Sequence, residues 1–197
     1  MKRKTFDLIV TAVGGALVVI LVVAGALLLV GANYANSSVH NQLARQEIYF
    51  PATKTINTKH NENYASRSEI LPYAGQQVLT GAQAQAYAYK VQMDVYGMPY
   101  HGVYSKISGY ALTHPTTKKF ASLVTVSFRG TTLQGLLLEA YAFSQFATIA
   151  TIGAIVSFVL AGLMLVLTVL GLLHFRRVTA AAEFPTVHER VEASKAA

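Results

Sequence analysis

Two long stretches of this sequence carry no charged side chain. Residues 8–32 and residues 147–173 consist mostly of small and aliphatic residues, without an Asp, Glu, Lys or Arg. A helix of either length spans about 37 to 40 Å, which is enough to cross a hydrocarbon core of about 30 Å. Only 13% of the whole chain is charged, against about a quarter in soluble domains. We therefore expect a mainly α membrane protein with two transmembrane helices, 8–32 and 147–174.

Basic residues border the two apolar stretches at their outer ends. They are Lys2, Arg3 and Lys4 before the first stretch, and Arg176 and Arg177 after the second. Because Lys and Arg concentrate on the cytoplasmic side of spans, we expect a multi-pass plasma-membrane protein with residues 1–7 and 175–197 in the cytoplasm. The triplet 24–26, which resembles a signal-peptidase site, lies inside the apolar stretch, so we expect an uncleaved anchor. The polar tail 175–197 is expected to be disordered.

The region between the spans, 33–146, is then a small, mostly helical extracytoplasmic domain. Thr80 and Gln83 have the spacing of a capping box, which marks a helix start. An apolar stripe at steps of four and three follows, made of Ala82, Ala86, Tyr89, Met93 and Tyr96. Gly97 and Pro99 would end the helix. These features predict a helix over residues 81–96.

A second capping box, Thr131 with Gln134, predicts the start of another long helix. Its apolar repeat continues into the second span, so we expect a helical stalk over residues 132–146. Residues 34–46 are expected to extend the first span in the same way. Residues 47–50, which precede a proline, are expected to be extended or a helix end.

Three further segments of this domain have weaker signals. Residues 57–68 are polar and read as a loop, and residues 104–112 are ambiguous. Residues 118–128 contain the β-prone run Leu123–Phe128, but we favour helix because a lone strand would have no evident partner. In the spans, pairs such as Ala12/Ala16 and Ala150/Ala154 would allow two helices to approach closely.

The residues that carry chemistry do not form a recognisable catalytic, cofactor or metal motif. Cys is absent, which excludes thiolate sites. His60, Glu62, His101 and His114 lack the spacing that would place two metal ligands on one helix face. A G-x-S-x-G elbow and a phosphate-binding loop are also absent. We therefore expect that the protein is not an enzyme and that it has no cofactor and no metal site.

The charge distribution argues against nucleic acid as a partner. Lys and Arg outnumber Asp and Glu in residues 33–146, but they are dispersed, whereas a nucleic-acid site needs a clustered basic face. The lipid bilayer is the one partner that the sequence itself indicates.

Tyrosine has the most uneven distribution of any residue type. All 11 tyrosines fall between Tyr34 and Tyr141, in the domain between the spans. They suit a recognition surface, because Tyr is enriched at interfaces; alternatively, they build the core of a domain without Trp. The candidate interaction surface consists of Tyr96, Tyr100, Tyr104, Leu133, Leu137 and Tyr141.

Several stretches together resemble a family of small two-span membrane proteins from actinobacteria. They are Ile48–Pro51, Tyr73–Val78, Thr80–Ala88 and, as the most specific, Phe128–Tyr141, whose sequence is FRGTTLQGLLLEAY. The resemblance implies the two-span topology and an actinobacterial source. Some members carry a ring-opening dioxygenase label, but the resemblance transfers no catalytic residue to this chain.

These observations lead to two expectations about function. The first is a non-catalytic accessory or scaffold subunit of a membrane protein assembly, which would contact a membrane protein partner or form a homo-oligomer. The alternative is a receptor-like module that binds an envelope ligand such as a wall glycan, a lipid or a peptide, with Tyr rings stacking on the ligand.

Overall fold

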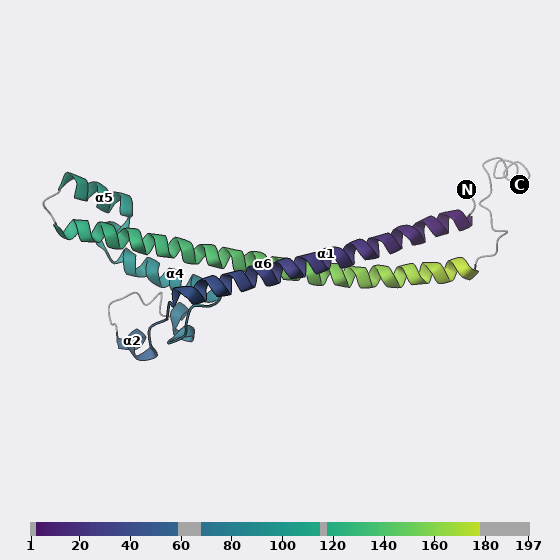
Figure 1. Ribbon diagram of the computed structural model, residues 1–197, viewed down its shortest axis with the longest axis horizontal. Coiled ribbons are helices and arrows are strands. Elements are labelled where there is room, and N and C mark those ends of the chain that lie inside the picture. Colours follow the sequence, from purple (N-terminus) through teal and green to yellow (C-terminus); the bar gives the residue numbers. More distant parts are fainter. Residues whose placement is uncertain (1–2, 59–67, 115–117, 178–197) are drawn as a thin grey trace, which may run out of the picture. The chain divides into compact units, whose positions relative to one another are not determined.

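A computed structural model of the chain describes residues 3–58, 68–114 and 118–177, and within these ranges the chain is mainly helical (Figure 1). The elements in order are α1 (Arg3–Gln46), α2 (Thr53–Thr58), η1 (Leu71–Tyr73), α4 (Gly81–Tyr96), η2 (Pro99–Gly102), α5 (Tyr104–Thr113) and α6 (Lys118–Arg177). The β pairing of these ranges is one antiparallel bridge between Tyr49 and Gln77. The predicted mainly α class is confirmed.

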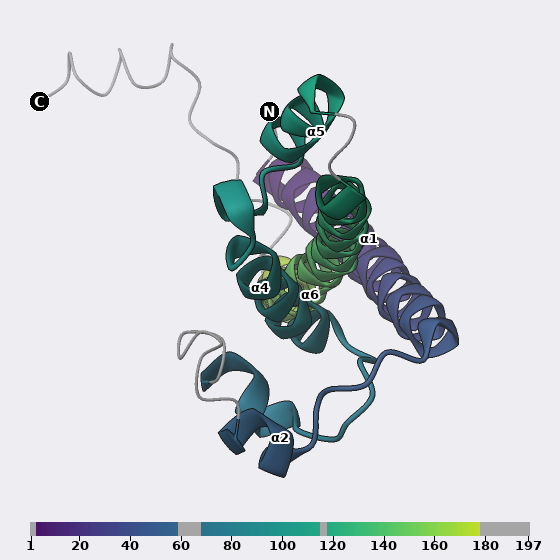
Figure 2. The same ribbon diagram turned by 90° about the vertical axis from the view of Figure 1, so that its left-hand side faces the viewer.

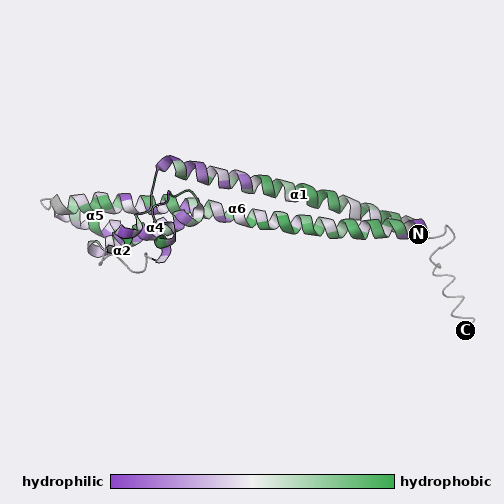
Figure 3. Cartoon of the chain, turned by 90° about the horizontal axis from the view of Figure 1, so that it is seen from below, coloured by the Kyte–Doolittle hydropathy of each residue, from purple (hydrophilic) through white to green (hydrophobic). Residues whose placement is uncertain are grey.

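Two of the helices are long and apolar enough to cross a membrane. The relevant segments are Leu8–Gln46 in α1 and Phe120–His174 in α6, and only 11% and 6% of their most apolar windows are buried. The core helices of a soluble protein would be mostly buried. Figure 3 shows hydrophobic colouring along most of α1 and hydrophilic colouring at its C-terminal end.

The contacts divide the chain into two compact units. One unit, here called the helix pair, consists of Met1–Val30 and Ala150–Ala197, and the other, the central domain, of Gly31–Ile149. Both long helices contribute a segment to each unit. The division lies within three residues of the predicted span boundaries, 32 and 147.

Small residues line the contact inside the helix pair. A Cβ on Gly14 would lie 2.7 Å from Thr168 Oγ1, and a Cβ on Gly25 would lie 3.0 Å from the Phe158 ring. Ala154 is buried as well, whereas Ala12 and Ala16 are exposed. The glycines therefore make the close approach that was expected of small residues, and the pair Ala12/Ala16 faces away.

The core of the central domain brings together residues from both long helices and from α4. Its buried members are Val39, Leu43, Phe50, Ile70, Val78, Ala84, Ala86, Ala88 and Leu137. Val39 and Leu43 lie on the C-terminal end of α1, as expected if residues 34–46 extend the first span.

Residues 48–50 are extended, which is one of the two predicted alternatives, whereas Glu47 is a left-handed turn residue with φ 51°. The Phe50 amide donates to the Gln76 carbonyl at 2.9 Å, and the Val78 amide donates to the Ile48 carbonyl at 2.8 Å. The Gln77 side chain also donates at 2.9 Å to the Ala44 carbonyl in the last turn of α1, which accepts a second bond from the Glu47 amide at 3.3 Å.

Helix α4 begins and ends where the sequence predicts. Thr80 Oγ1 accepts from the Gln83 amide at 3.3 Å, and Gln83 Oε1 accepts from the Thr80 amide at 3.1 Å, so the capping box is confirmed. The predicted apolar stripe is wrong in part, because Ala82 and Tyr96 are exposed. The residues of α4 that are buried are Gly81, Gln83, Ala84, Ala86, Ala88 and Val91. Small residues rather than large ones face the rest of the domain.

Helix α6 begins earlier than the second capping box implies. Thr131 Oγ1 donates to the Ser127 carbonyl at 2.8 Å, so it bonds back within a helix that is already formed and does not cap a new one. The β-prone segment 123–128 is helical, as favoured, and residues 104–113 form α5. Most of the predicted loop 57–68 and the tail beyond Arg177 lie outside the described residues.

Candidate interaction surface

The turn between α4 and α5 has an unusual backbone. Tyr100 has φ 56° and ψ 28°, His101 has φ 54° and ψ 32°, and Gly102 has φ 70°. A left-handed residue other than Gly costs roughly 1 to 2 kcal/mol, and two in succession are seldom found. The surrounding residues must therefore hold this turn in place.

Two contacts on either side of Gly102 hold the turn. A Cβ at this position would overlap the side chain and carbonyl of Val95 in α4, so only Gly fits. The Gly102 carbonyl accepts a 2.6 Å hydrogen bond from Ser127 Oγ of α6. Ser127 is fully buried, and bonds of this kind are stronger away from water. The turn is thereby tied to both helices.

Aromatic rings gather around this turn. Tyr96 stacks on His101 with a centroid distance of 4.5 Å, and Tyr104 lies 5.7 Å from Phe128 of α6. Tyr110 of α5 lies 4.3 Å from Phe120 of α6, which joins the two helices. Figure 2 shows α5 beside the N-terminal end of α6.

The outer rings of this cluster remain exposed. We call Tyr96, Tyr100, His101, Tyr104 and Phe128 together the aromatic face. The four Tyr and Phe side chains in it are 42% to 55% exposed. The aliphatic side chains of Val103, Leu112 and Val126, from the same segments, are also exposed. These exposed rings around one turn are the candidate interaction surface, because exposed apolar side chains that cluster mark interaction sites.

The structure gives the six residues of the predicted surface two different roles. Tyr96, Tyr100 and Tyr104 all belong to the aromatic face. Leu137 is buried at 1% exposure in the core of the central domain, so its assignment to an exposed surface is wrong. Leu133 packs against the same core, and Tyr141 is half-buried where α4 meets α6. The four-and-three spacing of the stalk residues reflects their packing inside the chain.

The remaining members of the aromatic face could not be found from spacing. His101, Phe128 and the supporting Ser127 come from segments that the sequence does not link. Two other tyrosines serve the core, because the Tyr73 and Tyr87 rings lie 5.4 Å and 5.3 Å from the buried Phe50 ring. The two interpretations of the tyrosines thus apply to different residues.

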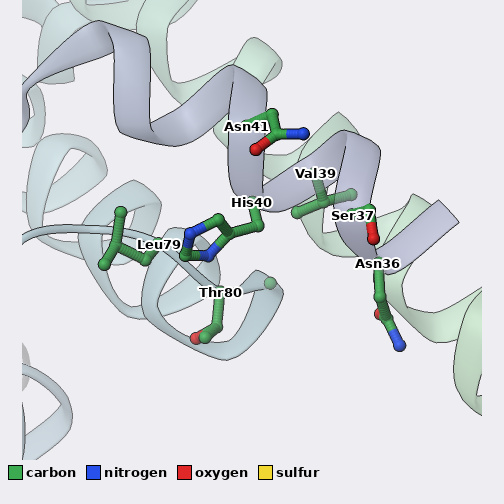
Figure 4. A pocket seen from close by; sticks show the side chains of 8 residues that line it. Asn36, Ser37, Val39, His40, Asn41, Leu79 and Thr80 are labelled. Atoms are coloured by element: carbon green, nitrogen blue, oxygen red, sulfur yellow. The ribbon is translucent and has the colours of Figure 1, made fainter. Parts of the chain in front are cut away.

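A cleft of about 530 Å³ lies between α1 and the start of α4. Its lining consists of Asn36, Ser37, Val39, His40, Asn41, Leu79, Thr80 and Gly81. Figure 4 shows the His40 ring directed toward Leu79 and Thr80. The polar groups of this lining are neutral amides, hydroxyls and an imidazole, which suit a ligand rich in hydroxyl groups.

A second cleft of about 380 Å³ lies between the central-domain segments of α1 and α6. Its floor includes the buried Val39 and Leu43, and its rim includes the exposed Tyr34 and Phe143. Glu139 contributes a carboxylate to this lining.

The two described histidines that were weighed as metal ligands, His101 and His114, stack on different tyrosines. His101 stacks on Tyr96, while His114 stacks on Tyr110 at 4.1 Å. Across residues 3–58, 68–114 and 118–177, no three His, Asp or Glu side chains are placed to hold a metal ion. His60 and Glu62, the other residues weighed as ligands, lie outside these ranges.

The chain was compared with family models, curated proteins and solved structures. None of them matches it. The resemblance to two-span actinobacterial proteins therefore stays a prediction.

Proposed function

We propose that the chain is a non-catalytic accessory or scaffold subunit of a plasma-membrane protein assembly. In this proposal α1 and α6 cross the bilayer, both termini are cytoplasmic, and the central domain lies outside. The proposal rests on one observation above all: an exposed aromatic face is built on a backbone turn that two helices hold rigid.

The physical chemistry of this face favours protein contact. Tyr and Phe bury a large apolar area when they are covered, and Tyr loses little side-chain entropy because it has two rotatable bonds. The left-handed turn is already fixed in the free chain, so binding would not have to order it. Rings and aliphatic side chains supply contact area rather than acid, base or nucleophile.

Capture of partners from native membranes tests this proposal. A tagged triple variant, Tyr96→Ala, Tyr100→Ala and Tyr104→Ala, is compared with the wild type by mass spectrometry after mild solubilisation. The matched control is Tyr34→Ala with Tyr49→Ala, two exposed tyrosines outside the aromatic face.

We expect stoichiometric membrane subunits to copurify with the wild type and the control but not with the triple variant. A monomeric wild type on native gels, or a triple variant that keeps all partners, would contradict the proposal. Circular dichroism of each variant separates loss of contact from loss of folding.

A receptor-like module for an envelope ligand is the second candidate. The cleft between α1 and α4 favours it, because its lining of amides, hydroxyls and an imidazole suits a hydroxyl-rich ligand such as a wall glycan. If this candidate holds, the full chain in nanodiscs binds wall material, and Asn36→Ala with Asn41→Ala weakens that binding while the Tyr triple variant does not.

A further inference from the structure

We propose that the aromatic face docks an acidic polypeptide segment of its partner. The inference rests on the proposed function and specifies the chemistry of the partner. It is carried by the charge pattern of the chain segments that build and surround the face.

Acidic residues are missing from the whole segment that builds the face. Between Asp94 and Glu139 the sequence contains no Asp or Glu, whereas it contains Lys106, Lys118, Lys119 and Arg129. Asp94 itself forms an ion pair with Lys90 at 2.5 Å. A stretch this long with four cations and no anion gives the region a net positive potential.

Two exposed cations lie on the helices that carry the rings. Lys106 is exposed on α5, two residues after Tyr104, and Arg129 is exposed on α6 directly after Phe128. Within the described ranges neither of them has an acidic partner in the chain. Lys118 and Lys119 begin α6, where the helix dipole adds further positive potential. Exposed rings together with unpaired basic side chains on the same two helices are complementary to a segment that carries both apolar and acidic side chains.

The composition of the face favours a polypeptide over a sugar. The segments that carry its rings also carry the exposed aliphatic side chains of Val103, Leu112 and Val126. A glycan would either leave these side chains exposed to water or cover them with hydroxyl groups that find no hydrogen-bond partner there. Aromatic residues and Arg together are typical of the centre of protein interfaces.

The position of the face along α6 argues against the chain's own membrane as its occupant. Phe128 precedes Ala147, where the apolar stretch begins, by 19 residues, which is about 28 Å of helix. The headgroup layer of a bilayer extends only about 5 to 8 Å beyond the hydrocarbon core. In the proposed topology the aromatic face therefore lies beyond the reach of the headgroups.

Two peptides of opposite charge test the inference directly. The probes are a fluorescent 12-residue peptide that alternates Glu with Leu and Phe, and its counterpart with Lys in place of Glu. Each is titrated by anisotropy against the full chain in nanodiscs of zwitterionic lipid. The variant is Lys106→Glu with Arg129→Glu, and the matched control is Arg45→Glu with Lys54→Glu, two exposed basic residues outside the face.

We expect the wild type and the control to bind the acidic peptide at least about tenfold more tightly than the basic one, with weaker binding at high salt. The Lys106→Glu, Arg129→Glu variant should weaken binding of the acidic peptide about tenfold and strengthen binding of the basic one. Equal binding of the two peptides, no binding of either, or no effect of charge reversal would overturn the inference.

Two further results separate this inference from the proposed function. If vesicles with phosphatidylglycerol bind the chain through Lys106 and Arg129 more tightly than the acidic peptide does, a lipid surface is the occupant and the inference is wrong. If charge reversal leaves the copurified partners unchanged while the Tyr triple variant loses them, the inference fails and the proposed function stands.

Discussion

At the level of single residues, the turn at Tyr100, His101 and Gly102 is the least expected feature of this chain. Gly102 has an evident reason to be Gly, since Val95 fills the space of a Cβ. Tyr100 and His101 adopt the same left-handed region without that freedom. Strain of this kind persists where surrounding contacts determine the backbone, and it is frequent at functional sites. Here it presents two aromatic side chains on the surface.

Replacement of His101 tests whether the turn is strained. Both His101→Gly and His101→Ala remove the stack on Tyr96, but only Gly adopts φ 54° without penalty. We expect the Gly variant to be more stable than the Ala variant by about 1 kcal/mol. In a helix or strand the order would be the reverse. Pulse proteolysis of the central domain in urea measures the difference, and an Ala variant that is equally or more stable would show that the turn is relaxed.

The buried hydroxyl of Ser127 gives a second prediction at this scale. Ser127→Ala removes the 2.6 Å bond to the Gly102 carbonyl and leaves that carbonyl without its partner in a buried site. We expect a loss of about 1 to 3 kcal/mol and weaker partner capture, because the turn loses its link to α6. Ser108→Ala is the control, since that hydroxyl is part of an exposed local bond to Ser105 and its removal should change little. Equal stability of the two variants would contradict the role given to Ser127.

At the level of elements, local signals predicted α4 well and α6 badly. The Thr80–Gln83 capping box is real because the chain before it is extended and the helix truly begins there. The same pattern at Thr131 and Gln134 lies inside α6, where Thr131 bonds back to Ser127. The capping-box motif alone does not show whether the residues before it are already helical. The β-prone run Leu123–Phe128 is likewise overridden by its helical surroundings.

The buried face of α4 was mispredicted in part for a related reason. Ala86 of the predicted stripe is buried, but Ala82 and Tyr96 are exposed, and α4 also buries Gly81, Ala84 and Ala88. Close approach to α6 leaves no room for larger residues there, and that distance is a tertiary property. Tyr96, at the C-terminal end of α4, is exposed and belongs to the aromatic face. Spacing alone could not distinguish these two faces.

A pair of glycines on these helices tests the close contact. A Cβ on Gly81 would overlap the Ser144 side chain of α6, whereas a Cβ on Gly135 would meet nothing. We expect Gly81→Ala to destabilise the central domain by about 1 to 3 kcal/mol, because α4 must move away from α6. Gly135→Ala should raise stability by up to about 1 kcal/mol, since Ala favours a helix interior over Gly. A stable Gly81→Ala variant would show that the helices tolerate a wider separation.

At the scale of the whole molecule, the unit boundaries agree with the hydropathy of the chain. The helix pair ends at Val30 on α1 and begins at Ala150 on α6, close to the ends of the two charge-free stretches. In the helix pair, α1 and α6 have apolar surfaces and contact each other through glycines. In the central domain, the same two helices are amphipathic and share a buried core. This change is what a chain needs if it leaves a bilayer and enters water, because lipid and water demand opposite surfaces.

The orientation of the chain gives the last prediction. Because the sequence has no Cys, a single introduced thiol reports its side of the membrane without background. Gln85→Cys lies at an exposed position of α4, and Ser194→Cys lies in the tail. We expect a membrane-impermeant maleimide to label Gln85→Cys on intact cells and Ser194→Cys only after lysis, because basic residues that flank both spans favour cytoplasmic termini.

Labelling of Ser194→Cys but not of Gln85→Cys on intact cells would reverse the orientation, and labelling of both would show that one apolar helix does not cross. The first result would move the aromatic face to the cytoplasmic side, and the acidic segment that Lys106 and Arg129 are proposed to meet would then have to be sought among cytoplasmic proteins. The second result would leave the face outside, because Gln85 belongs to the same central domain. Labelling of Gln85→Cys on intact cells is therefore the result that places the partner in the cell envelope.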